Sequence, residues 1–432
     1  MNEQPSKKNV PRLLLALAAT AALLIIILAV ILTSPAANKQ TGSERNEAGA
    51  GAKQGEASTA ADRADIAPTV NIPISLDPPA EAPKAIQADI PSLAEAFKDA
   101  FPIGAAIEPK ETQGLHGEML KKHFNSLVAG NAMKAASLQP REGQFDWKGA
   151  DQIAAFAREN GMELRFHTLV WHQQSPPWFF LDEDGFRMMD ETDPVKREAN
   201  KKLLLERLDT HIRTVVERYK DDIVAWDVVN EVVDEAETDG MRHSDWYMLT
   251  GSDYIVTAFK AAREAAGEDA KLIINDYNTN MPQKRDILLR LVKDLIAQGV
   301  SIDGVGHQTH VNVEWPSGAE IVASIQAFAE LGLDNQITEL DMSVYGYSNR
   351  SDYGDDLPEG LLETQAKRYR EIFDAFLSVK DDISSVTFWG IADDNTWLNT
   401  FPVTRTDYPL PFDRELQAKP AFWALVEPSV TP

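Results

Sequence analysis

Residues 223–231 read IVAWDVVNE, an apolar run that ends in Asn230 and Glu231. A valine-rich run of this length without helical periodicity is typical of a buried strand in a parallel sheet. An ionised carboxylate at the end of such a strand is costly unless it is paired or takes part in chemistry. The interpretations open for Glu231 are therefore an ion pair, a helix cap and a catalytic role.

Seven further apolar runs in the chain predict strands of the same kind. They are IGAAI (103–107), FNSLVAGNA (124–132), ELRFHTLVWH (163–172), KLIINDY (271–277), DGVGHQTH (303–310), QITELDMSV (336–344) and SVTFWGI (385–391). Amphipathic stretches between the runs predict helices at 149–160, 194–219, 251–266, 282–298, 318–331 and 361–379. Eight strands alternating with helices over residues 89–432 predict an α/β fold, a (β/α)₈ TIM barrel. An open doubly wound sheet is the alternative, but no strand precedes a glycine-rich phosphate-binding fingerprint.

The first 88 residues have a different character. Residues 13–32 are uncharged and mostly apolar, and as a helix they would span roughly 30 Å of hydrocarbon. The short basic segment 1–12 precedes them, so the positive-inside rule predicts a cytoplasmic amino terminus and an exported catalytic domain at 89–432. Small residues at 34–36 leave cleavage as a signal peptide open, so the domain is expected to be membrane-anchored or secreted. Residues 33–88 are rich in Ala, Gly, Ser and Pro and predict a flexible linker.

Composition excludes several classes of function. The chain has 42 basic and 67 acidic side chains, a net charge of −25, which would repel the phosphates of nucleic acid. The absence of cysteine excludes disulfides, thiolate catalysis and cysteine zinc sites.

A second carboxylate lies in QITELDM, where Glu339 and Asp341 are two residues apart and share one face of a strand. In a barrel of parallel strands the carboxyl ends form the active-site face, so Glu231 and Glu339 are expected to face each other across its mouth. Aromatic, amide and imidazole side chains at the other strand ends would suit a neutral, hydroxyl-rich ring. These candidates are His167, Trp171, His172, Asn275, Asp276, Tyr277, Gln308, His310, Trp389 and Trp397.

Six ordered motifs resemble those of the endo-β-1,4-xylanases of glycoside hydrolase family ten. They are HTLVWH (167–172), WDVVNE (226–231), NDYN (275–278), GVGHQTH (304–310), ITELDM (337–342) and TFWGIADDNTWL (387–398). The resemblance extends from about residue 90 through PFDRELQAKPAFWAL (411–425). It implies a domain that hydrolyses internal bonds of xylan and xylo-oligosaccharides with retention of configuration. We expect a monomeric domain without a cofactor or catalytic metal, while a structural calcium ion near Asp352, Asp355 and Asp356 remains an open alternative.

The resemblance also implies roles for individual residues. Glu231 would be the general acid/base and Glu339 the nucleophile. Asn230 would hold the sugar 2-hydroxyl, while His310, steered by Asp341, would orient the nucleophile. Further side chains match positions that bind the sugar or support the site: Asn131, Lys134, His167, Trp171, His172, Asn275, Tyr277, Gln308, Trp389 and Trp397.

The second strand departs from the family pattern. The family carries E-N-x-M-K followed by an aromatic residue and Glu, whereas residues 130–136 read GNAMKAA. Gly130 removes a carboxylate that would bind a sugar hydroxyl, and Ala135 and Ala136 leave space that another side chain or water must fill. We expect weakened or altered sugar recognition on the non-reducing side rather than loss of the reaction.

Other functions remain open at this point. An anchored xylan-binding or sensing protein with little turnover would fit the changes in the second strand. A metallohydrolase would use His167, His172, His310 and Asp341 as ligands, but IGAAI offers no histidine and the two glutamates would have no role. A cellulase or mixed-linkage glucanase would use the same barrel.

Overall fold

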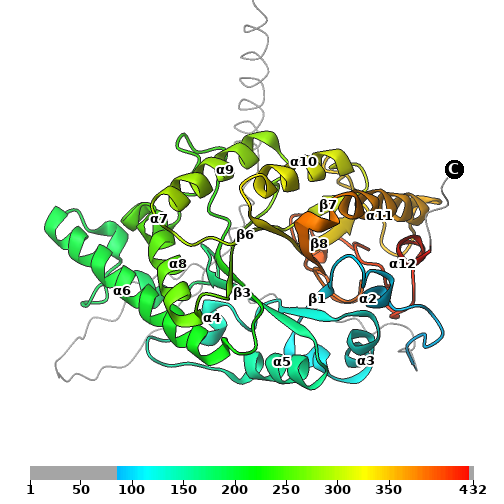
Figure 1. Ribbon diagram of the computed structural model, residues 1–432, viewed down its shortest axis with the longest axis horizontal. Coiled ribbons are helices and arrows are strands. Elements are labelled where there is room, and N and C mark those ends of the chain that lie inside the picture. Colours follow the sequence, from blue (N-terminus) through cyan, green and yellow to red (C-terminus); the bar gives the residue numbers. More distant parts are fainter. Residues whose placement is uncertain (1–84, 428–432) are drawn as a thin grey trace, which may run out of the picture. The chain divides into compact units, whose positions relative to one another are not determined.

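Eight parallel strands close into a barrel in the computed structural model, which describes residues 85–427 (Figure 1). Each strand pairs with the next, β6 pairs directly with β8, and β9 returns to pair with β1. This closed parallel arrangement confirms the predicted barrel and excludes the open sheet. The barrel strands are β1 (Ile103–Ile107), β2 (Ser126–Ala129), β3 (Glu163–Val170), β4 (Ala225–Asn230), β5 (Lys271–Asp276), β6 (Gly304–His307), β8 (Asp334–Ser343) and β9 (Ile383–Phe388).

The predicted sixth strand over 303–310 is wrong in one respect, because the structure divides it. The barrel strand β6 ends at His307, and a short strand, β7 (His310–Asn312), resumes beyond it. Thr309 has a φ of 61°, a left-handed conformation that a regular strand does not include. The turn places His310 opposite Asp341 of β8 in the β7–β8 pairing.

Helices form an outer ring around the strands in Figure 1. All six predicted helices are present within a few residues, and the helix over 194–219 has the predicted bounds. The side chain of Asp193 caps that helix by accepting hydrogen bonds from the backbone of Val195 and Lys196 at 2.8 and 3.1 Å. The α-helices are α2 (Leu93–Ala96), α3 (Gly114–His123), α4 (Ala135–Leu138), α5 (Lys148–Glu159), α6 (Pro194–Tyr219), α7 (Asp245–Thr250), α8 (Asp253–Ala266), α9 (Pro282–Ala297), α10 (Gly318–Ala329), α11 (Leu361–Ser378) and α12 (Pro420–Val426). Five 3₁₀ segments are Pro109–Thr112, Pro177–Phe180, Met188–Asp190, Lys380–Asp382 and Trp397–Asn399.

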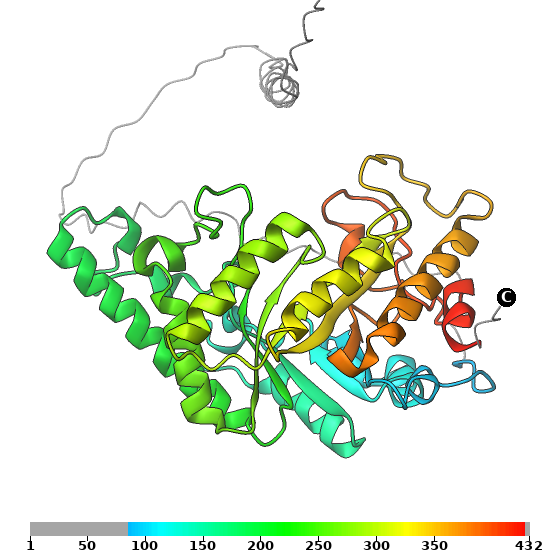
Figure 2. The same ribbon diagram turned by 45° about the horizontal axis from the view of Figure 1, so that its top comes forward.

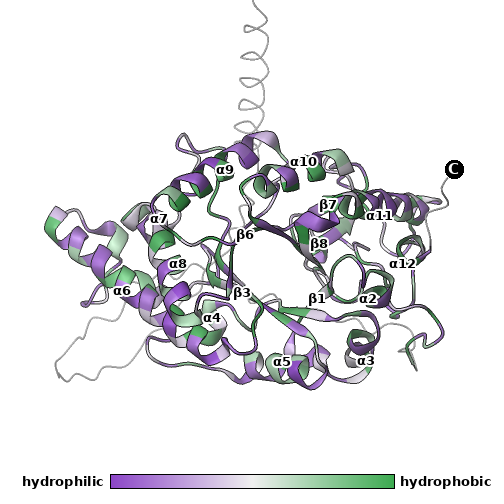
Figure 3. Cartoon of the chain, in the orientation of Figure 1, coloured by the Kyte–Doolittle hydropathy of each residue, from purple (hydrophilic) through white to green (hydrophobic). Residues whose placement is uncertain are grey.

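The core lies between this ring and the barrel wall. Polar and apolar residues alternate around the ring helices in Figure 3, as expected for helices with one face on the barrel. Every residue of β4 is buried, including Asp227 in its middle. Asp227 is tolerated there because Arg165 Nη2 and His167 Nδ1 contact its two oxygens at 2.7 and 3.0 Å.

The first described residues lie beside the last ones (Figure 2). Gln87 Oε1 accepts a hydrogen bond from the backbone of Ala418 at 2.7 Å, so the chain contacts the barrel just before the predicted domain start at residue 89. The predicted membrane segment 13–32 and most of the linker lie outside the described residues. Within 85–427, no helix is long and apolar enough to cross a membrane.

A buried ion pair ties β5 to the helix that follows it. Asp276, the last residue of β5, lies 2.8 Å from Lys284 of α9, and neither side chain is exposed. Asp276 Oδ2 also accepts a hydrogen bond from the backbone of Val233 at 3.1 Å. The pair therefore holds α9 to the loop that follows Glu231.

We predict that Lys284→Met lowers the free energy of unfolding by about 3–5 kcal/mol, because it leaves a buried carboxylate without its partner. The control is Lys271→Met, which breaks a half-exposed pair with Asp334 at 3.0 Å and is expected to cost about 0–1 kcal/mol. Denaturant unfolding of both variants measures the difference. Equal losses would contradict the prediction.

Candidate active site

Glu231 directly follows β4 and leaves the strand through a left-handed turn. Its φ is 57°, a conformation that costs about 1–2 kcal/mol for a residue other than glycine. Two contacts hold it: the backbone N–H of Glu231 donates to Asn275 O at 2.9 Å, and Arg242 Nε donates to Glu231 O at 2.8 Å. The Glu231 side chain is 14% exposed, so it can reach a ligand in the barrel mouth.

Glu339 lies within β8 and is only 5% exposed. Its Oε1 accepts a hydrogen bond from Asn275 Nδ2 at 2.8 Å, and its Oε2 lies 3.3 Å from His310 Nε2. The other ring nitrogen of His310 lies 2.9 Å from Asp341 Oδ1. Trp397 Nε1 donates to the second Asp341 oxygen at 2.7 Å. An imidazole is thus held between two carboxylates on one side of β8.

Buried amides connect the two glutamates. Gln308 Nε2 lies 3.2 Å from Glu231 Oε1 and 3.1 Å from Asn230 Oδ1. Asn275 Nδ2 donates to the same Asn230 oxygen at 2.9 Å and to Glu339. One hydrogen-bond network therefore runs from Glu231 to Glu339, so both carboxylates belong to one site.

The orientation of Asn275 depends on its surroundings below the site. Thr338 Oγ1 donates to Asn275 Oδ1 at 2.7 Å, which fixes the amide with its NH₂ group toward Glu339. Gly306 of β6 leaves room for it, since a Cβ there would lie 2.2 Å from Asn275 Oδ1. A side chain at position 306 would displace the amide that contacts the catalytic candidates.

Electrostatics assign the charge states of this site. Burial would raise the pKa of Glu339, but the positive field of His167 and the hydrogen bonds and charge of His310, with the Asn275 amide, lower it to about 2. Burial would lower the pKa of His310, but the charges and hydrogen bonds of Asp341 and Glu339 raise it to about 10. At neutral pH Glu339 is ionised and His310 is protonated. Burial lowers the pKa of His172 to about 4, so this ring is neutral.

Aromatic and imidazole rings surround the carboxylates, and all of them except the buried His167 are partly exposed. The ring centroids of His167 and Trp389 are 5.3 Å apart, and those of His310 and Trp397 are 4.9 Å apart. Trp171 has the Lys134 ammonium 4.7 Å from its ring centroid. The buried atoms Trp171 Nε1 and His172 Nδ1 have no hydrogen-bond partner among the described residues. Partly exposed ring faces suit a sugar, which presents apolar faces and hydroxyl edges.

The structure brings the predicted site residues together at the carboxyl ends of the strands. Asn131 contacts Lys134 at 3.2 Å, and Tyr277 accepts a hydrogen bond from Arg242 Nη2 at 2.8 Å, beside Glu231. The ring nitrogen His172 Nδ1, which has no hydrogen-bond partner among the described residues, lies 3.8 Å from Glu231 Oε2. Side chains that sequence reasoning missed are Glu108, Gln174, Asp227, Arg242 and Thr338. Asp227 and Thr338 lie within the quoted motifs WDVVNE and ITELDM, but the sequence does not show their contacts, because the partners of all five side chains come from other parts of the chain.

Metal binding finds no support in residues 85–427, where no group of three His, Asp or Glu side chains is arranged to hold an ion. Of the ligands imagined for a metallohydrolase, His310 has both nitrogens engaged by carboxylates, and His167 Nδ1 contacts Asp227. The arrangement favours carboxylate chemistry.

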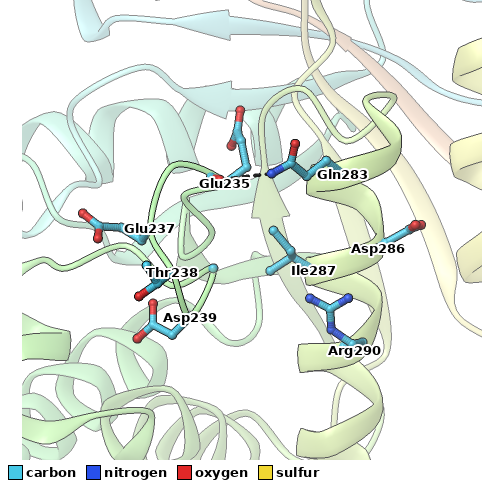
Figure 4. A pocket seen from close by; sticks show the side chains of 9 residues that line it. Glu235, Glu237, Thr238, Asp239, Gln283, Asp286, Ile287 and Arg290 are labelled. Atoms are coloured by element: carbon cyan, nitrogen blue, oxygen red, sulfur yellow. Dashed lines mark hydrogen bonds between the residues drawn. The ribbon is translucent and has the colours of Figure 1, made fainter. Parts of the chain in front are cut away.

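A hollow of about 360 Å³ lies outside this cleft, between the loop after β4 and α9 (Figure 4). Gln283 Nε2 donates to the backbone oxygen of Glu235 there at 3.1 Å. Four of its nine lining residues are acidic and one is basic, and the lining includes no aromatic side chain and no predicted site residue. Its lining is Glu235, Glu237, Thr238, Asp239, Gly240, Gln283, Asp286, Ile287 and Arg290.

Comparison with known proteins agrees with this geometry. The model of glycosyl hydrolase family 10 matches residues 92–428. A thermostable celloxylanase of Thermoclostridium stercorarium is 62% identical over 341 residues, which are 79% of this chain and 88% of the relative. Endo-1,4-beta-xylanase A of Halalkalibacterium halodurans is 56% identical over 78% of this chain and 87% of its own. The crystal structure of xylanase B from Clostridium stercorarium F9 is 63% identical, with a TM-score of 0.78, over 78% of this chain and all of that chain.

We predict that His310→Asn raises the pKa of Glu339 from about 2 toward its ordinary value of about 4.3, because the neighbouring cation is lost. Carboxyl NMR titration measures this pKa, and His243→Asn, which removes a surface histidine, is the control. An unchanged Glu339 titration would contradict the electrostatic assignment.

The same shifts set the pH range of the stabilisation. Folding lowers the pKa of Glu339, so its contribution is complete above about 4.3 and is lost as pH falls through about 2. Folding raises the pKa of His310, so its contribution is complete below about 6.5 and is lost as pH rises through about 10. His310→Asn should therefore reduce the free energy of unfolding most between about pH 4.3 and about pH 6.5, where both contributions are complete.

Proposed function

The chain belongs to glycosyl hydrolase family 10 and is an endo-1,4-β-xylanase, and we propose that Glu231 and Glu339 are its catalytic carboxylates. The assignment depends on the different surroundings of the two glutamates within one hydrogen-bond network. Glu339 is buried and kept ionised by His310, whereas Glu231 is accessible and contacted by the neutral Gln308 amide. One group is suited to attack carbon and the other to exchange a proton.

The enzyme retains configuration through two displacements. In the first, Glu339 attacks the anomeric carbon while Glu231 gives its proton to the oxygen of the leaving sugar. The bond between the sugars breaks and a glycosyl ester forms on Glu339, which loses its charge. In the second, Glu231 takes a proton from water, the water oxygen attacks the same carbon, and Glu339 leaves as a carboxylate.

The neighbouring side chains position these groups. His310 and Asn275 hold one oxygen each of Glu339, so its orientation does not depend on the substrate. Asn230 directs its carbonyl oxygen toward Gln308 and Asn275. Its NH₂ group donates to Glu231 Oε1 at 3.4 Å, which leaves its second N–H for the 2-hydroxyl of the sugar under attack. Trp171, Trp389 and Trp397 then supply ring faces for the xylose units.

We predict that Glu339→Ala and Glu231→Ala each lower kcat on xylan at least about a thousandfold in the full chain. The variants should differ on an aryl xylobioside with an acidic leaving group, because that group needs no proton. Glu231→Ala should then still form the glycosyl-enzyme, and added azide should release it as the glycosyl azide. The exposed Glu330→Ala is the control, and either alanine variant with more than about a tenth of normal kcat on xylan would contradict the assignment.

A second substrate follows from the name of one relative, a celloxylanase that is 62% identical. We propose secondary activity on β-1,4-glucan by the same carboxylates. Carboxymethyl cellulose assayed beside xylan tests it, and activity that survives Glu339→Ala would point to another protein.

We further propose that this catalytic domain acts outside the cell, anchored by residues 13–32 or released after their cleavage. The support is the apolar length of that segment and the basic residues before it. Protease added to intact cells should release or destroy the xylanase activity if the chain is anchored, and the culture medium should contain it if the segment is cleaved. Activity confined to the protected cytoplasmic fraction would contradict export.

A further inference from the structure

We propose that Glu108 supplies a sugar-binding carboxylate at the non-reducing end of the cleft, in the space that a side chain at position 130 would take. This inference rests on the proposed function, because it concerns how the xylan chain is held. It changes the meaning of Gly130, which by sequence alone indicates the loss of such a carboxylate.

Strand pairing brings the two positions together. In the β1–β2 register Ile107 lies opposite Ala129, so the residues that follow, Glu108 and Gly130, leave the barrel side by side. The backbone N–H of Gly130 donates to Ile107 O at 2.9 Å. A Cβ added to Gly130 would lie 2.9 Å from Glu108 Oε1.

The glycine at position 130 is explained by the lack of room for a side chain beside Glu108. The φ of Gly130 is not in the left-handed region, so its backbone conformation is open to any residue. A real Cβ contact at 2.9 Å would force the Glu108 carboxylate to move. Gly130 therefore keeps a place free for Glu108.

The Glu108 carboxylate contacts residues that the family resemblance assigns to sugar binding. Asn131 Nδ2 donates to Glu108 Oε1 at 2.6 Å, and Asn131 Oδ1 accepts from Lys134 Nζ at 3.2 Å. The charges of Glu339, Glu108 and Glu231 all act on the Lys134 ammonium, so Glu108 belongs to the same charged neighbourhood as the two catalytic candidates.

The loop that carries Glu108 is fixed before any ligand binds. The backbone N–H of Glu108 donates to Glu111 Oε2 at 2.7 Å, and Gln152 Nε2 of α5 donates to Pro109 O at 2.7 Å. Asn395, in the loop after β9, donates to the other oxygen of Glu111 at 2.5 Å. A carboxylate held in this way loses little conformational freedom on binding.

The chemistry suits a sugar hydroxyl as donor. A carboxylate has about four acceptor positions, and the Asn131 amide takes one of them. Glu108 is partly exposed, so a ligand can reach the others. Hydrogen bonds from hydroxyls to a charged oxygen are short and strong, and the Trp171 ring beside Lys134 offers a face to the same sugar.

The test compares two substrates in the full chain. An aryl β-xylobioside places a second sugar beyond the one under attack, whereas an aryl β-xyloside has none. Glu108→Gln keeps the shape and removes the charge, and we expect kcat/KM on the xylobioside to fall about 10- to 100-fold, with less than about a threefold change on the xyloside. Glu118→Gln, an exposed glutamate on the neighbouring α3, should change neither. Equal effects of Glu108→Gln on both substrates, or none on either, would overturn the proposal.

Gly130→Ala is the independent variant. Its methyl group should displace the Glu108 carboxylate and weaken xylobioside turnover without lowering Tm, and it should add less than a twofold effect in a Glu108→Ala background. Additive losses in the double variant would overturn the proposal.

Measuring the Kd of xylobiose tests the role of Glu108 independently of the catalytic assignment. In a Glu339→Ala background, Glu108→Gln should raise the Kd of xylobiose about 10-fold or more by calorimetry, whether or not the wild type turns over either substrate. An unchanged Kd would contradict only the sugar-binding role of Glu108. Full activity of Glu339→Ala would contradict only the catalytic assignment.

Discussion

The ionised state of Glu339 is the condition on which the rest of the site depends. A carboxylate that is 5% exposed would ordinarily take up a proton, and the positive field of His167 together with the hydrogen bond and charge of the His310 imidazolium prevents this. That imidazolium is itself maintained by Asp341, whose second oxygen is fixed by Trp397. The break of the sixth strand at Thr309 is needed for this contact, because it moves His310 from the barrel wall to a position opposite Asp341.

The barrel supplies rigidity for this arrangement. Asn275 contacts Asn230 and Glu339 from β5, and it keeps one orientation because Thr338 donates to its carbonyl oxygen while Gly306 leaves it space. Donors arranged before the substrate binds need no reorganisation during the reaction, which is the main way that fixed dipoles accelerate it. The left-handed turn at Glu231 adds to this arrangement, since it takes the Glu231 carboxyl group out of the buried strand and into the barrel mouth.

The sequence predicted the barrel because its strands are buried on both faces and appear as short apolar runs. It also predicted that Glu231 and Glu339 lie together at the barrel mouth, because a carboxylate in a buried strand is costly unless it is paired or takes part in chemistry. It did not predict the division of the sixth strand, because threonine carries no local signal for a left-handed φ. Nor did it predict Arg242, which supports Glu231 through a backbone oxygen, or Asp227, whose partners come from the neighbouring strand. Such contacts depend on which segments meet in space.

Gly130 shows how this limit affects the interpretation of function. In a linear motif a glycine in place of a glutamate is a missing group, and the expected consequence is weaker binding. In the barrel, neighbouring strands end side by side, so the carboxylate of the residue after β1 lies where a side chain on the residue after β2 would begin. The requirement of the sugar is for an acceptor at a point in space, and it does not specify which strand provides it. A departure from a family motif at a strand end is therefore interpreted together with the residues that follow the adjacent strands.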